Sequence, residues 1–167
     1  TPVTAFMATA VKAATFVAFL RVFDMGEQIQ SVSLLNVLTW IAVLTMLAGN
    51  IAAIMQDNFK RLLAYSSVAH SGYAMVGLIA AAFGTDFNSG ASSLLFYLFS
   101  YAFMTIGAFA IVAVFEKKAD TNLKVSDLKG LARKYPVLGL CLTVLMLSLA
   151  GIPPTLGFFG KFYIFTA

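Results

Sequence analysis

The sequence holds little that could bind a metal or a redox cofactor. It has one cysteine and one histidine in 167 residues, and a phosphate-binding loop and a Cys-x-x-Cys pair are both missing. An iron–sulfur cluster needs several thiolates, so this stretch cannot hold one by itself, nor can it offer a pair of histidines to a haem. Cys141 lies in an apolar run and has no second cysteine to pair with, which excludes a disulfide framework. We therefore expect no cofactor and no redox chemistry in this chain.

Charge is scarce as well. Charged residues make up 11% of the chain, against about 25% in soluble domains. Hydrophobic residues make up 60%, and the mean hydropathy is +0.90. These values predict an all-α polytopic membrane protein, because a segment that crosses lipid must satisfy its own backbone polar groups in a helix. The net charge of +4 does not indicate a nucleic-acid partner, since loop placement accounts for it.

Hydropathy predicts five transmembrane helices in a single membrane domain, 1–167. The expected spans are about 3–23, 34–54, 59–83, 91–115 and 136–167. The stretch 84–90 (GTDFNSG) has the composition of a turn. The chain begins with Thr1 rather than Met and stops inside an apolar run, so we expect an internal fragment of a longer protein.

The charges of the connectors predict the orientation. The turn 56–61 is net +1 and the connector 116–134 is net +3, whereas 21–33 and 84–90 are each net −1. Basic residues favour the cytoplasmic side of a membrane. The sequence therefore predicts that Thr1, the 56–61 turn and the 116–134 connector face the cytoplasm of a bacterial inner membrane, or the organellar equivalent.

Lys12 stands near the middle of the first span. At about 1.5 Å per residue it lies roughly 14 Å from either face of the bilayer. An ammonium there costs on the order of 3 kcal/mol, so a chain that keeps it usually has a use for the charge. One interpretation is a lysine that gains and loses a proton. The other is a structural lysine paired with an acid from elsewhere.

The third span places Ser66, His70, Tyr73 and Gly77 on one face of a helix, at steps of four, three and four residues. Histidine titrates near neutral pH and can pass a proton from one ring nitrogen to the other. The face predicts either a proton relay or a polar seam between packed helices.

The fifth span is interrupted by Gly-Ile-Pro-Pro at 151–154 and carries Lys161 beyond the break. A proline frees the carbonyl four residues before it, here that of Leu149 or Ala150. Broken helices beside ionisable residues are typical of ion-translocating proteins, although a packing kink with a snorkelling lysine has the same pattern.

Lys60 lies at the membrane boundary, where it either anchors the helix end together with Arg61 or feeds protons from the cytoplasmic side.

Two stretches carry a resemblance to a known family. The stretches KRLLAYSSVAHSGY and LSLAGIPPTLGFFGKFY resemble the antiporter-like membrane-arm subunits of respiratory complex I. A lysine after the Gly-Ile-Pro-Pro break, here Lys161, is similar to the N-type subunits among them. The plastid homologue of that subunit is the second resemblance. The family fold contains two inverted repeats of helices, and the likeness covers the whole chain as the end of the first repeat and most of the second.

The resemblance implies proton translocation. Lys12 corresponds to the family's central-axis lysine and Lys161 to the lysine of the second broken helix, while Lys60 and His70 match polar positions of the second half-channel. It also implies other membrane-arm subunits, lipid and protons as partners, and an NADH:quinone oxidoreductase whose FMN, iron–sulfur clusters, NADH and quinone belong to other subunits. A sodium/proton antiporter, a membrane-bound hydrogenase subunit and a passive membrane scaffold stay open as alternatives.

Overall fold

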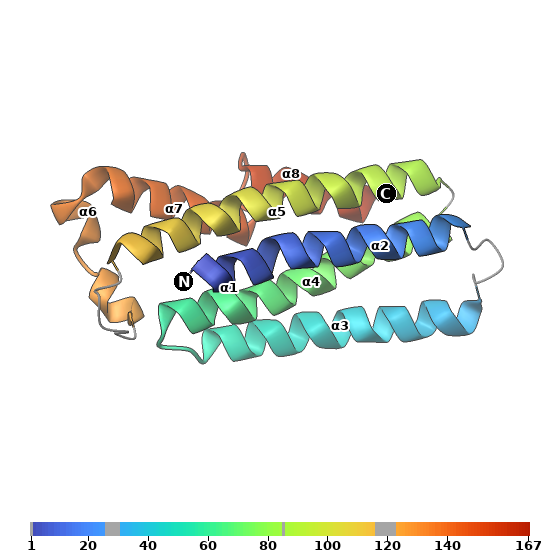
Figure 1. Ribbon diagram of the computed structural model, residues 1–167, viewed down its shortest axis with the longest axis horizontal. Helices are drawn as coiled ribbons and strands as arrows, with labels where there is room; N and C mark the ends of the chain where they lie inside the picture. Colours follow the sequence, from blue (N-terminus) through green and yellow to red (C-terminus); the bar gives the residue numbers. More distant parts are fainter. Residues whose placement is uncertain (1, 26–30, 85, 116–122) are drawn as a thin grey trace.

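The computed structural model describes residues 2–25, 31–84, 86–115 and 123–167, and most of these residues are helical (Figure 1). The elements in chain order are α1 (Pro2–Phe6), η1 (Met7–Val11), α2 (Lys12–Met25), α3 (Val32–Ile54), α4 (Phe59–Phe83), α5 (Phe87–Phe115), η3 (Val125–Leu128), α6 (Leu131–Lys134), α7 (Pro136–Ala150) and α8 (Leu156–Thr166). The predicted all-α class is confirmed. Four helices are long and apolar enough to cross a membrane, namely Pro2–Met25, Val32–Ile54, Phe59–Phe83 and Phe87–Phe115.

The first of these helices contains a turn that hydropathy did not predict. Its middle part, η1, is a π-helix, and the residues on either side, Phe6 and Lys12, keep right-handed helical backbone angles. The chain therefore runs through α1, η1 and α2 as one continuous helix. A π-turn holds an extra residue, and such turns frequently mark functional positions. Lys12 follows this turn directly.

The predicted turn at 84–90 is wrong in its second half, because α5 already begins at Phe87. The Asp86 carboxylate accepts a hydrogen bond from the Asn88 N–H at 3.0 Å and so satisfies one of the free donors at the helix start. Gly90 then packs against the backbone of Ala81 on α4, where a larger residue would not fit. Local capping and close packing outweigh the loop-like composition.

The predicted fifth span, 136–167, consists of two helices. Pro136 opens α7 at its first position, where a missing N–H has no cost. Gly151 ends α7 with φ +86, a left-handed conformation that favours glycine, and α8 begins five residues later at Leu156. Both helices pack against α5, one after the other along its length (Figure 1). That they make one membrane crossing stays a prediction.

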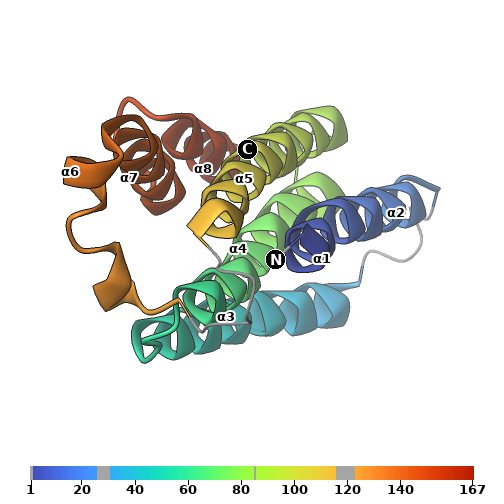
Figure 2. The same cartoon turned by 60° about the vertical axis from the view of Figure 1, so that its left-hand side comes forward.

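The centre of the bundle is formed by α4 and α5, with α3 outside α4 (Figure 2). Buried apolar side chains form two clusters, one around Tyr101 and Phe109 and one around Leu78 and Leu94. Polar side chains are buried as well: Thr9, Ser67, His70, Ser100, Thr105 and Ser148. In contrast, α3 buries only two small residues and exposes most of its apolar side chains, as expected of a helix with a lipid-facing or helix-facing outer surface.

The described part of the 116–134 connector is fastened to the turn between α3 and α4. The Phe59 N–H donates to the Leu123 carbonyl and the Val125 N–H donates to the Asp57 carbonyl, both at 2.9 Å. Two short helices that were not predicted, η3 and α6, follow. Some charged residues used to predict the orientation, at 26–30 and 116–122, lie outside the described residues.

The contact between α3 and α4 generates a prediction for stability. A Cβ added at Gly49 would lie 2.5 Å from the backbone nitrogen of Ala69, so the two helices would have to separate. We expect Gly49→Ala to lower the free energy of unfolding of the full-length subunit by about 1–3 kcal/mol, the usual cost of overpacking. Thermal unfolding in detergent measures it.

The matched control is Gly107→Ala. The atoms nearest to a Cβ there belong to the Leu145 side chain, whose closest atom, a methyl carbon at 2.9 Å, can rotate away. Equal melting temperatures for the two variants would contradict the prediction.

Candidate functional site

Lys12 reaches from the first helix to α4. Its Nζ donates to the main-chain carbonyl of Ser67, and also to the Ser67 hydroxyl oxygen at 2.7 Å. The ammonium lies over the ring of Tyr101 on α5, 4.9 Å from the ring centroid. A cation over the negative face of an aromatic ring is attracted to it. Lys12 is thus half-buried between three helices, with its charge held by two oxygens and one ring.

His70, on α4, is buried, with 5% of its surface exposed. Its Nδ1 shares a hydrogen bond of 2.6 Å with the Tyr97 hydroxyl, and the tautomer decides which atom donates. The rings of Tyr101 and Tyr73 lie beside the imidazole, with centroid distances of 4.8 and 5.7 Å. The imidazole is therefore fixed in place by tyrosines of both α4 and α5.

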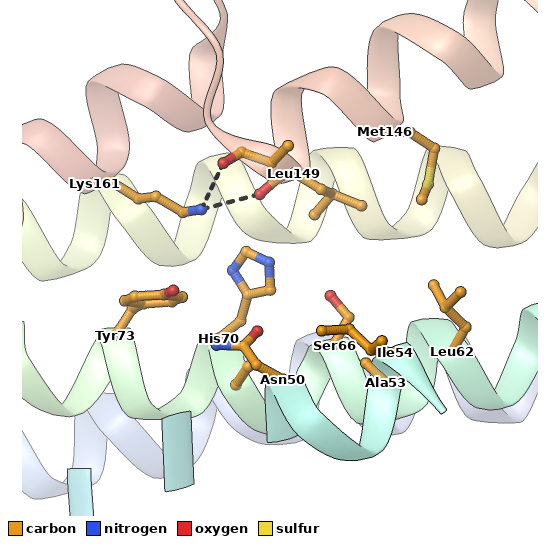
Figure 3. Close-up of a pocket in the computed structure, with 12 residues that line it drawn as sticks. Asn50, Ala53, Ile54, Leu62, Ser66, His70, Tyr73, Met146, Leu149 and Lys161 are labelled. Carbon is orange, nitrogen blue, oxygen red and sulfur yellow. Dashed lines mark hydrogen bonds between the residues drawn. The ribbon is translucent and has the colours of Figure 1, made fainter. Parts of the chain in front are cut away.

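Lys161, on α8, turns back to the end of α7. Its Nζ donates to the carbonyl oxygens of Leu149 and Ala150, at 3.1 Å each. These carbonyls belong to the last turn of α7, where they have no partner inside the helix and carry the negative end of the helix dipole. The same ammonium lies 4.9 Å from the centroid of the Tyr73 ring. Figure 3 shows Tyr73 below the lysine and both carbonyl contacts.

These contacts join into a continuous row. It runs from Lys12 to the Tyr101 ring, from there to His70, on to Tyr73, and ends at Lys161. We call these five residues the lysine row. It crosses the bundle through four helices, the Lys12 helix, α5, α4 and α8, so that a lysine stands at each end with the histidine between them.

A cavity of about 400 Å³ lies beside one end of the row, between α3, α4, α7 and α8 (Figure 3). Its polar lining comes from Asn50, Ser66, His70, Tyr73 and Lys161, and the rest is apolar. The His70 ring points from α4 toward the break between α7 and α8. A space of this size with several hydrogen-bonding groups can hold water.

The residues predicted from sequence are brought together in part. Lys12, His70 and Lys161 all stand in the lysine row, and Ser66 and Tyr73 line the cavity. Lys60 lies in the first turn of α4, about 15 Å along the helix axis from His70. It is therefore outside the row. Among the residues that the structure describes, no three His, Cys, Asp or Glu side chains gather as a metal site.

Three residues of the site were not predicted: Ser67, Tyr97 and Tyr101. Ser67 was not predicted because its neighbour Ser66 was assigned to the helix face of His70 instead. The two tyrosines are four residues apart on α5, so they share one helix face. That spacing, on a helix that also carries Ser100 and Thr105, was the one signal in the sequence that could have indicated a polar seam.

Comparison with known proteins gives consistent matches over the full chain. The family model described as NADH:quinone oxidoreductase/Mrp antiporter, TM, matches residues 1–167. NADH-quinone oxidoreductase subunit N of Bdellovibrio bacteriovorus is 59% identical over 167 residues, which is 100% of this chain and 34% of that relative. NAD(P)H-quinone oxidoreductase subunit 2 of Rippkaea orientalis is 44% identical over 172 residues, 100% of this chain and 31% of the relative.

A solved structure is similar as well. A chain of respiratory complex I from Thermus thermophilus with bound aureothin has a TM-score of 0.78 and 41% identity, and the match covers 99% of this chain and 34% of that one. The chain thus spans about a third of the length of the curated relatives it matches.

The hydrogen bond between Tyr97 and His70 generates a prediction. Tyr97→Phe keeps the ring but leaves the buried Nδ1 without its phenol partner. We expect the free energy of unfolding of the full-length subunit to fall by about 1–3 kcal/mol, the cost of an unsatisfied buried polar group. Thermal unfolding in detergent would show it.

Tyr163→Phe is the control, because Tyr163 lies on α8 with 47% of its surface exposed. Removing that hydroxyl should leave the melting temperature near its native value. A loss as large as that of Tyr97→Phe would contradict the assignment.

Proposed function

Because the chain belongs to the NADH:quinone oxidoreductase/Mrp antiporter transmembrane family, we propose that it conducts protons within an N-type subunit of respiratory complex I. The observation that supports this proposal is the lysine row, in which Lys12 and Lys161 are linked through His70 and two tyrosines. NADH oxidation and quinone reduction, with FMN and the iron–sulfur clusters, belong to other subunits of the assembly. This chain contributes proton transfer and no redox step.

The chemistry of the row suits proton transfer. The imidazole of His70 can take a proton on one nitrogen and release it from the other, and water in the adjacent cavity can carry it to Lys161. Each lysine has oxygen acceptors that hold it when it is charged. A change of charge at one end of the row changes the potential at the other, because charges interact strongly where the dielectric constant is low.

We propose that α7 and α8 together make the fifth membrane crossing. They lie one after the other along α5, itself one of the four long apolar helices (Figure 1). The residues 151–155 would then be non-helical at membrane depth, which is tolerated where the backbone faces protein or a water-filled cavity. Leu149, Ala150 and Lys161 all line the cavity of about 400 Å³ beside the lysine row.

The setting of the protein follows from the same assignment. We propose that the end of the bundle with the 56–61 turn and the connector faces the cytoplasm of a bacterial inner membrane or its organellar equivalent, which its excess of basic residues favours. Other membrane-arm subunits and lipid cover the exposed apolar faces. Lys60, on this side, is proposed as the cytoplasmic end of the proton path.

Two alternative functions remain to be separated from this one. The family description includes the Mrp antiporters, so the row could serve a sodium/proton antiporter or a related hydrogenase subunit. In the second alternative the polar residues only specify helix packing, and the chain is a passive scaffold. Removing a charge from the row tests the scaffold, and changing the cation tests the antiporter.

We expect Lys12→Ala in the full-length protein to lower proton pumping on the order of tenfold or more while assembly is retained, because the row loses its first proton carrier. Proton uptake by membrane vesicles, per NADH oxidised, measures the effect.

Lys129→Ala removes the charge of an exposed connector lysine and should pump normally. Native pumping by Lys12→Ala would favour the scaffold.

Replacing Na⁺ by K⁺ in the same vesicles should leave pumping unchanged, since the Lys161 ammonium already occupies the free carbonyl oxygens of Leu149 and Ala150 and would repel a metal cation there. The initial rate of proton uptake in the two salts is the measurement. A requirement for Na⁺ would favour the antiporter.

A further inference from the structure

The hydroxyl of Ser148 connects three helices at the break between α7 and α8. Its Oγ accepts a hydrogen bond from the Gly157 N–H at 3.0 Å and donates to the Sδ of Met104, on α5, at 2.7 Å. Ser148 is 5% exposed and Met104 is 2% exposed. One buried hydroxyl therefore joins the last turn of α7, the first turn of α8 and the middle of α5.

The start of α8 needs this contact. The first N–H groups of a helix have no partner within it, and the Thr155 side chain, at the cap position, makes no capping hydrogen bond to them. Its hydroxyl donates to the Ile152 carbonyl instead. Ser148 therefore supplies, from another helix, the acceptor that a cap residue would normally provide.

The close approach also explains the glycine on the other side of the contact. A Cβ at Gly157 would overlap the carbonyl group of Ser148 and would lie 3.2 Å from the Met104 Sδ. Only glycine brings the start of α8 near enough for its N–H to reach the serine hydroxyl. The sequence GIPPTLG thus ends in a residue whose lack of a side chain is required.

Ser148 directly precedes the carbonyl acceptors of Lys161 on α7 and also bonds to α8, the helix that carries Lys161. The two residues that follow it, Leu149 and Ala150, give the carbonyls that accept from Lys161. Gly157 precedes Lys161 by four residues, about one turn of α8. The hydrogen bond between Ser148 and Gly157 therefore fixes the distance between the lysine and its acceptors.

We propose that Ser148 is a positioning residue for proton transfer, which holds α8 against α7 so that the Lys161 ammonium stays on the two freed carbonyls. This inference rests on the function proposed above. Met104 assists because its sulfur accepts the hydrogen bond from the Ser148 hydroxyl, which leaves the hydroxyl oxygen free to accept from the Gly157 N–H.

The test uses the full-length subunit in the assembled complex, with proton uptake per NADH oxidised measured in membrane vesicles across a range of pH. Ser148→Ala removes the hydroxyl, and we expect pumping to fall roughly fivefold, the change that the loss of one hydrogen bond produces in a rate. The pH profile of the remaining pumping should also be displaced from the native one, because the surroundings of a proton-carrying group have changed.

Met104→Leu keeps the volume at the sulfur position and should act in the same direction. The double variant should lose less than the product of the two single losses, since both changes act on one contact. If Ser148→Ala does not assemble, Met104→Leu with its pH profile decides the question.

Thr143→Ala is the matched control, because it removes a hydroxyl from the same helix that bonds only to the Gly139 carbonyl of its own turn. We expect native pumping and a native pH profile. Native behaviour of Ser148→Ala, or an equal loss in both variants, would overturn the proposal.

Lys161→Ala distinguishes a failure of the proposed function from a failure of the positioning role of Ser148. If it pumps normally, the proposed function fails and the positioning role with it. If it does not pump while Ser148→Ala and Met104→Leu do, only the positioning role fails.

Discussion

Polar groups deep in a lipid bilayer must find partners inside the protein, and this constraint organises the bundle. Ending α7 before the prolines frees the carbonyls of its last turn, and a half-buried ammonium beside them needs acceptors. Lys161 meets both needs, since its Nζ donates to the carbonyl oxygens of Leu149 and Ala150. Within the proposed membrane crossing, the lysine would satisfy the carbonyls that the helix break frees, and those carbonyls would satisfy the ammonium.

The two lysines of the row solve the same problem in different ways. Lys161 uses carbonyls that a broken helix leaves free, whereas Lys12 uses the carbonyl and the hydroxyl of Ser67 on an intact helix. Both then rest on a tyrosine ring at 4.9 Å from its centroid. The acceptors of Lys12 belong to an unbroken helix, and those of Lys161 to the end of a broken one. The two lysines therefore need not respond alike to a change of charge at His70, between them.

The sequence predicted the class of the fold and the residues at the ends and middle of the row, for physical reasons. Hydropathy reports long apolar helices, and an ionisable residue such as Lys12 or His70 stands out against them. It did not predict Tyr97 and Tyr101, because aromatic residues are common in apolar helices and their partners lie on other helices. The boundary at Phe87 depends on a carboxylate cap and on a close helix contact, which composition does not report.

The π-turn Met7–Val11 has a consequence for the direction of the first charge. A π-turn takes up one residue more than a regular turn, so the residues after it differ in direction by about 100° from those of an unbroken α-helix of the same length. With a regular turn in its place, the side chain at position 12 would face more than a quarter of a revolution away from Ser67. The direction of this ammonium is therefore decided by the winding of the turn before it: tightening Met7–Val11 into a regular turn with no change of sequence would turn the lysine away from Ser67, whereas a chain one residue shorter there could wind regularly and keep the lysine on the same face.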